Sequence, residues 1–218
     1  MELGFTPATA LVTVILLALA PFVAVMVTSF TKIVVVLSLL RNALGLQQSP
    51  PNVVLNGLAL ILSIYVMYPV GQEMLAVAPE LPAEQSVMQD TGALLAVANA
   101  AKEPLRDFLV EHAHPEQRAF FLDTIRRTLP PERAAEITET SFVVVVPSFT
   151  VSELAEAFQI GFLIFLPFLV IDLVISNILL AMGMMMLSPT MISLPFKLLL
   201  FVLISGWSQL AQNLVLSY

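Results

Sequence analysis

The chain has 218 residues, of which 58% are hydrophobic and 11% are charged, and its net charge at pH 7 is −7. Soluble domains carry about a quarter charged residues, so this composition is typical of a membrane protein. The lack of cysteine excludes disulfides, thiolate metal sites and a cysteine nucleophile. An acidic chain without a basic patch also excludes nucleic acid as a partner.

The N-terminal part, residues 1–70, is predicted to be a hydrophobic helical hairpin. Its first helix is expected over residues 8–30, with a kink at Pro21. No lysine or arginine precedes this segment, so we expect it to be retained and not cleaved as a secretory signal. The turn-rich QQSPPN at 47–52 separates it from a second hydrophobic helix over 53–70.

The middle part, residues 71–141, is polar and acidic. Of the 16 acidic residues in the chain, 14 lie between Glu73 and Glu156. Helical pieces bounded by prolines are expected near 92–112, 115–129 and 131–140. This part is therefore predicted to be a small solvated helical insert.

The C-terminal part, residues 142–218, is predicted to be a second hydrophobic hairpin. The β-branched run FVVVVPSFT at 142–150 favours a short extended piece. The spacing from Thr150 to Glu153 is that of a capping box, which predicts a helix start at Thr150.

The hydrophobic helix that follows is expected to reach about Met186, with an interruption at Pro167. The last segment, 191–216, is expected to break early at Pro195. The predicted fold is therefore all-α, built from polytopic-membrane-like hydrophobic hairpins with kinked, proline-broken helices and one polar insert.

The few basic residues outside the insert predict the orientation in the membrane. Lys32 and Arg41 stand between the first two hydrophobic segments, and Lys197 follows the third. Because positive charges favour the cytoplasmic side, these turns are expected in the cytoplasm and the acidic insert on the periplasmic side. Lys32 and Arg41 are interpreted as topology and loop anchors.

Asp172 lies within the apolar sequence FLVIDLVIS, where a charge is costly unless it has a partner or a pathway. Ser176 and Asn177 are the nearest polar residues. A proton-coupling carboxylate and a buried interhelix bond involving Asp172 and Asn177 both fit this pattern.

No signature of an enzyme occurs in the sequence. His112 and His114 are the nearest approach to a metal motif, and without further clustered ligands they are interpreted as part of a solvated loop. No nucleophile elbow, phosphate-binding loop or dinucleotide fingerprint is present. We therefore expect a protein without catalytic activity, metal or cofactor.

Five of the ten methionines lie within AMGMMMLSPTM, residues 181–191. Methionine is flexible and apolar, so one interpretation is packing at a helix end. The other interpretation requires several copies of the chain, whose Met184, Met185 and Met186 would converge on one axis as an apolar constriction that blocks ions.

Three long stretches carry a resemblance to a known family. They are TSFTKIVVVLSLLRNALGLQQSPPN (28–52), FTVSELAEAFQIGFLIFLPFLVIDLVISNILLAMGMMMLSP (149–189) and ISLPFKLLLFVLISGW (192–207). Together they resemble the R-type subunit of the type III secretion export apparatus, the SctR/YscR family, whose flagellar relative is FliP. The QQSPPN turn favours the injectisome branch over the flagellar one. Ser205 stands where the family pattern has an acidic residue before Gly-Trp.

The resemblance implies a core subunit of the export gate in the bacterial inner membrane. It implies a ring of about five copies with S-type and T-type subunits, next to other export-apparatus and basal-body proteins, that passes unfolded effectors. The assembled complex is expected to be raised above the bilayer plane. The resemblance further implies that Met184, Met185 and Met186 form a pore gasket, and that Glu153 and Lys197 form an intersubunit salt bridge.

Two other function classes remain open from the residues. A small secondary transporter would use Asp172 as its coupling site, although no inverted repeat is visible. A structural scaffold would keep the oligomer and leave the methionines as packing residues.

Overall fold

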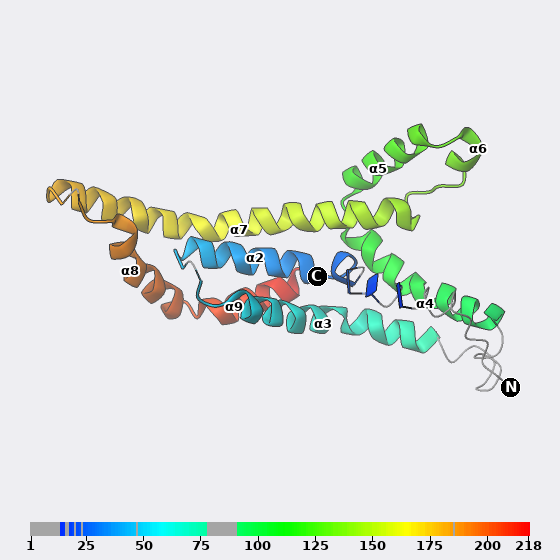
Figure 1. The fold of residues 1–218 in the computed structure, drawn as a ribbon, viewed down its shortest axis with the longest axis horizontal. Coiled ribbons are helices and arrows are strands. Elements are labelled where there is room, and N and C mark those ends of the chain that lie inside the picture. The colour runs from blue at the N-terminus through cyan, green and yellow to red at the C-terminus, as the bar shows by residue number, and fades with distance from the viewer. Residues whose placement is uncertain are drawn as a thin grey trace.

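The computed structural model describes residues 14–15, 18–19, 21–22, 24–46, 48–77, 91–184 and 186–218, with side chains described throughout except at 77 and 91–101. All regular elements in these ranges are helices (Figure 1). They are α2 (Phe30–Ala43), α3 (Asn52–Val77), α4 (Thr91–His112), α5 (Pro115–Thr128), α6 (Pro131–Ala134), α7 (Phe142–Ala181), α8 (Pro189–Leu203) and α9 (Gly206–Leu216). The predicted all-α class is confirmed.

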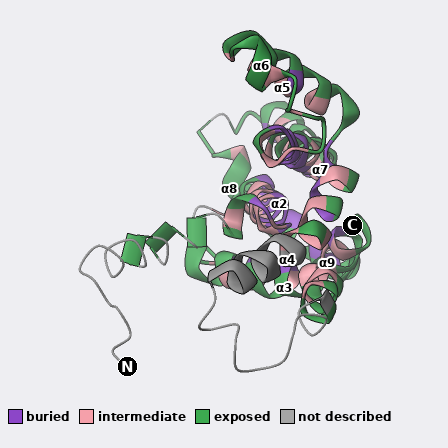
Figure 2. Cartoon of the chain, turned by 90° about the vertical axis from the view of Figure 1, so that its right-hand side faces the viewer, coloured by how far each residue is buried: buried purple, intermediate pink, exposed green. Residues whose placement is uncertain are grey.

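The longest helix, α7, runs almost the full length of the elongated molecule (Figure 1). Helix α2 lies between α7 and α3, and α4 packs against both α3 and α7. Helices α5 and α6 stand on the side of α7 that faces away from α3, in both views (Figures 1 and 2). From the far end of α7, α8 and α9 turn back, and α9 reaches α3.

Helix α2 forms the centre of the packed core. Ile33, Val36, Leu37 and Leu40 recur at the spacing of one helix face and are almost fully buried. Ile33, Val36 and Leu37 pack in one cluster with small residues of both neighbouring helices, Ala59 on α3 and Ala157 on α7. Short side chains at these positions allow the backbones to approach closely, so α2 is covered by α3 and α7 (Figure 2).

Two described helices, α3 and α7, are long and apolar enough to cross a membrane. The bent pair of α8 and α9, whose axes meet at 60°, would add a third crossing. Residues 8–13, 16–17, 20 and 23 of the expected first hydrophobic helix lie outside the described residues, so its kink at Pro21 stays a prediction. Large apolar side chains cover the outer surface of α7, among them Phe162, Leu163 and Val170.

The segment around Lys32 and Arg41 is a helix and not the turn that the hydrophobic pattern suggested. Both residues belong to α2, which continues to Ala43. The turn is confirmed only for the following residues, up to the start of α3 at Asn52. Apolar residues recur along α2 with the helical period of 3.6, and this pattern favours a helix over a turn. The apolar face lets α2 pack against two neighbouring helices.

The expected extended piece at 142–150 is wrong, because α7 already begins at Phe142 and continues through Pro147. The predicted helix start at Thr150 is also wrong, since its hydroxyl donates to the carbonyl of Val146 within the helix. Val145 and Phe149 pack on Phe108 of α4. This burial overrides the β propensity of the valine run.

The insert is helical as predicted, with α4 and α5 close to the expected 92–112 and 115–129. The third expected piece, 131–140, is a helix only over Pro131–Ala134. Helix α4 does not stand apart from the hydrophobic helices, because Phe108 and Leu109 are buried against α7.

Gly161 on α7 provides a test of how closely α2 and α7 pack. A Cβ there would overlap Leu39 Cδ1 and lie 3.0 Å from Leu39 Cβ on α2. Gly161→Ala is therefore expected to lower the free energy of unfolding by about 1–2 kcal/mol, because overpacking outweighs the gain in helix propensity. Thermal unfolding in detergent measures this.

The matched control is Gly57→Ala on α3, where no atom lies within 4 Å of the added Cβ. That change is expected to stabilise the chain by up to about 1 kcal/mol. Equal effects of the two substitutions would contradict the close approach of α2 and α7.

Candidate functional site

An ion cluster with a buried centre at Lys32 and Glu153 joins four parts of the chain, and we call it the Lys32 cluster: Lys32, His114, Glu153, Glu156 and Tyr218. The Lys32 ammonium donates to Glu156 Oε2 at 2.6 Å and lies 3.7 Å from Glu153 Oε1. The side chains of Lys32 and Glu153 are each 1% exposed. A charged group so deeply buried is stable only when it is paired, so these contacts hold α2 against α7.

Tyr218 completes the cluster from the end of the described chain. Its hydroxyl donates to Glu153 Oε2, and the Lys32 ammonium lies 4.3 Å from the centroid of its ring. His114 reaches Glu156 from the connection between α4 and α5, with 2.8 Å between Nε2 and Oε1. The backbone N–H of His114 donates to Ser152 Oγ. The cluster thus fixes α2, α7, the α4–α5 connection and the segment after α9 relative to one another.

The local sequence explains why α7 supplies both carboxylates. Glu153 and Glu156 are three residues apart, so they project from the same side of the helix. Lys32 lies in the facing stretch of α2. A single lysine in one apolar helix and an acid pair in another were the signal that sequence reasoning missed.

A second polar cluster, the Lys197 cluster, lies near the other end of α7 and consists of Lys197, Asp172 and Ser193. Lys197 Nζ donates to Asp172 Oδ2 at 2.7 Å and to the carbonyl oxygen of Ala43 at 3.2 Å. Ser193 Oγ donates to Asp172 Oδ1 at 2.5 Å. Lys197 is 4% exposed, although Asp172 keeps about a quarter of its side-chain surface.

The Lys197 cluster fastens α8 to two helices at once. Asp172 provides the bond to α7, and Ala43 is the last residue of α2, where a cation is favoured by the helix dipole. Gly45, at φ +79°, lets the chain leave α2 directly beside Lys197. Lys197 therefore ties α8 to both helices, and Ser193 adds a second bond to α7.

The intersubunit pair of Glu153 and Lys197 stays a prediction. Within the chain Glu153 contacts Lys32 and Tyr218, and Lys197 contacts Asp172. Both residues are buried in these contacts. A salt bridge between copies would therefore require each of them to exchange its partner during assembly.

Both carboxylate oxygens of Asp172 accept hydrogen bonds from α8, which is the geometry of an interhelix bond. Asn177 does not share this site and is exposed in the single chain, so a buried interhelix role for it stays a prediction. Five residues along an α-helix rotate the side chain by about 140°, which takes Asn177 off the face that carries Asp172.

Lys32 and Arg41 have different surroundings although both were interpreted as loop anchors. Lys32 is buried in the cluster described above and lies in no loop. Arg41 does hold the loop between α2 and α3, because its Nη1 donates to Asn52 Oδ1 at 2.5 Å and to the carbonyl of Pro50 at 3.3 Å.

The methionine-rich segment forms the turn between α7 and α8, at one end of the molecule (Figure 1). Helix α7 closes with Gly183 at φ +72°, and the N–H of Met184 donates to the carbonyl of Leu179. Met184 is 41% exposed and Met186 fully exposed. Met185 lies outside the described residues. Met184 and Met186 thus lie on a turn at the end of the molecule, where the helices of this chain leave them exposed.

Comparison with known proteins finds one family match, in which residues 12–214 fit the FliP family. The chain is 52% identical over 203 residues to the Yop proteins translocation protein R of Yersinia pestis, covering 93% of this chain and 92% of that protein. It is 47% identical over 211 residues to the hypersensitivity response secretion protein HrcR of Ralstonia nicotianae, covering 97% of each. It is 46% identical over 221 residues to the virulence protein YscR of Salmonella typhimurium, covering 100% of each.

Proposed function

This chain belongs to the FliP family, and from that premise we propose that it is a core subunit of a type III secretion export gate. Its relatives are translocation and secretion proteins, and the chain is accordingly a membrane component of a secretion apparatus. In the proposed gate it forms, with S-type and T-type subunits, the entrance through which unfolded effector proteins pass. Other export-apparatus and basal-body proteins are the surrounding partners.

The observation that carries the proposal is the exposed methionine turn on a firmly held support. The Lys197 cluster fixes α8 to α7 and α2 on one side of the turn. Met184 and Met186 are exposed on this turn, Met186 fully. In a ring of about five copies such turns would meet at a shared axis and form the apolar constriction of a gasket, together with Met185.

The exposed apolar surfaces of α3 and α7 also support assembly. In the 18-residue windows of these helices that fit a membrane span, 17% and 11% of the residues are buried inside the chain. Such surfaces need lipid or partner subunits. We place the protein in the inner membrane, with the insert on the periplasmic side and the assembled gate raised above the bilayer plane.

The transporter alternative receives no support from the surroundings of Asp172. Ser193 and Lys197 occupy its two carboxylate oxygens and tie α7 to α8. The scaffold alternative differs from the gate only in the role of the methionines, so a conductance measurement separates the two.

Replacing Met184, Met185 and Met186 together by alanine is expected to raise the ion leak of cells that produce the complete gate several-fold. Shorter side chains leave a wider constriction that water can fill. Potassium efflux and membrane potential report the leak. Met191→Ala, which removes an exposed methionine on α8 outside the triple, is the matched control and should leave the leak unchanged.

If the triple variant assembles normally and its ion leak equals that of the parent, the methionines form no gasket and the scaffold hypothesis is favoured. Subunit content of the purified gate, measured by native mass spectrometry, shows whether assembly is normal.

A further inference from the structure

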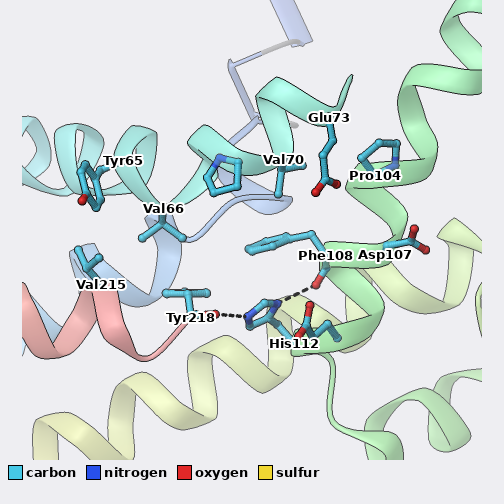
Figure 3. Close-up of a pocket in the computed structure, with 12 residues that line it drawn as sticks. Tyr65, Val66, Val70, Glu73, Pro104, Asp107, Phe108, His112, Val215 and Tyr218 are labelled. Atoms are coloured by element: carbon cyan, nitrogen blue, oxygen red, sulfur yellow. Dashed lines mark hydrogen bonds between the residues drawn. The ribbon is translucent and has the colours of Figure 1, made fainter. Parts of the chain in front are cut away.

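A pocket of about 380 Å³ opens between α3, α4 and the C-terminal end of α9 with Tyr218 (Figure 3). One end is lined by Tyr65 and Val215, and the other by Glu73 and Asp107, with Phe108 between them. Glu111 also lines it, and no lysine or arginine does. The pocket thus combines an aromatic and apolar floor with three carboxylates.

These carboxylates are available for a partner. Glu73, Asp107 and Glu111 are exposed, and none of them forms an ion pair with another described side chain. A floor of aromatic rings below free carboxylates suits a cationic group next to an apolar one. Arginine and aromatic anchors are the residues that carry most of the binding energy in protein interfaces.

The chain itself presents that chemistry on α5. Phe120 is 60% exposed on this polar helix. Arg127 follows seven residues later, on the same helix face, and its side chain is 79% exposed. Its only ion pair within the described residues is the exposed one with Asp123, which is weak enough to be exchanged.

Helix α5 lies on one side of α7 and α3, which lines the pocket, lies on the other side in both views (Figures 1 and 2). A single copy therefore cannot place its own α5 in its own pocket. A contact between a pocket on one copy and a helix on the next is heterologous, which is the kind of contact that closes a ring.

We propose that the pocket between α3 and α4 binds α5 of a neighbouring copy of this chain, with Phe120 on the aromatic floor and Arg127 at the carboxylates. The proposal rests on the assembly of copies stated under the proposed function and specifies one contact surface for it. In this contact the exposed Phe120 would pack on aromatic rings, and Arg127 would pair with the exposed carboxylates of the pocket.

The chain contains no cysteine, so an introduced pair provides the only thiols that this chain can cross-link. Val70 lines the pocket, and Thr124 lies one turn from Phe120 on the exposed side of α5. Oxidation of the Val70→Cys/Thr124→Cys variant, in the complete gate, is expected to give disulfide-linked dimers and higher multimers. The matched control is Val70→Cys/Ala119→Cys, because Ala119 is exposed but about 140° round the helix from Thr124.

Charge substitutions in the cross-linking variant test the electrostatic half of the contact. Arg127→Glu is expected to lower the cross-linked fraction several-fold, and Asp107→Arg in the same chain to restore part of it. Arg133→Glu on α6, also exposed, should change nothing.

The outcomes are separable. Multimers with Thr124 but few with Ala119 support the contact. A ring seen by native mass spectrometry without cross-links from Thr124 overturns the contact and leaves the proposed gate standing. A monomer under all conditions overturns both.

Discussion

Lys32→Met is expected to lower the free energy of unfolding by about 3–5 kcal/mol, the range for breaking a buried ion pair from one side. Removing the ammonium leaves Glu153 1% exposed and takes away the cation beside Glu156. Glu153 Oε1 has no hydrogen-bond donor among the described residues, so Lys32 provides its compensation. Thermal unfolding in detergent should show a midpoint roughly 6–20 °C lower.

A second substitution keeps this prediction testable if the single variant folds poorly. Lys32→Met combined with Glu153→Gln removes the buried charge and is expected to recover part of the lost stability. Arg127→Met, which breaks the exposed pair with Asp123, is the control and should cost less than about 1 kcal/mol. Similar losses from Lys32→Met and Arg127→Met would show that Lys32 is not a structural centre.

Lys197→Met is the second large effect, with an expected loss of about 3 kcal/mol in the isolated chain. The change leaves Asp172 without its cation and the carbonyl of Ala43 without its donor. Because these bonds hold α8 beside α2 and α7, α8 and the methionine turn should also become more mobile. Hydrogen exchange of α8 amides, together with thermal unfolding, measures both consequences.

The same variant separates the two roles of Lys197. If the lysine serves only an intersubunit bridge with Glu153, the isolated chain would keep its stability and lose assembly alone. A destabilised monomer supports the pair with Asp172. If Lys197 exchanges Asp172 for Glu153 of another copy during assembly, Lys197→Met should lower both the stability of the isolated chain and the formation of the ring. Both quantities must therefore be measured on the same preparation.

The two polar clusters and the exposed apolar side chains occupy different positions along α7. The Lys32 cluster holds α2, α7 and Tyr218 together at the end near α4, and the Lys197 cluster holds α8 near the methionine turn. Between and beyond them, apolar side chains on α7 remain exposed. A rigid support with open apolar surfaces is the arrangement that an assembling subunit requires.

Several features followed from the sequence alone. Hydrophobic content and the lengths of the apolar segments determined the class of all-α membrane protein, because a span of about 20 apolar residues satisfies its own backbone only as a helix. Prolines and the acidic stretch located the ends of α4 and α5. The three long stretches quoted above identified the family, which the comparisons confirm.

The helical state of 142–150 required the tertiary structure. The valine run and Pro147 favour an extended chain locally, and only the burial of Val145 and Phe149 against Phe108 makes the helix preferable. The stretch from Phe30 to Ala43 carries a helical period in its own sequence, but its position between α3 and α7 was decided by the tertiary packing.

The partners of the charged residues were also decided by the tertiary structure. The sequence showed that Lys32, Asp172 and Lys197 stand in or beside apolar sequence, because such exceptions are visible in any hydrophobic run. Which cation meets which carboxylate depends on how α2, α7 and α8 lie side by side, at separations of 25 to 124 residues along the chain. Sequence therefore determined that buried charges must pair, and the packing of the helices decided the pairs.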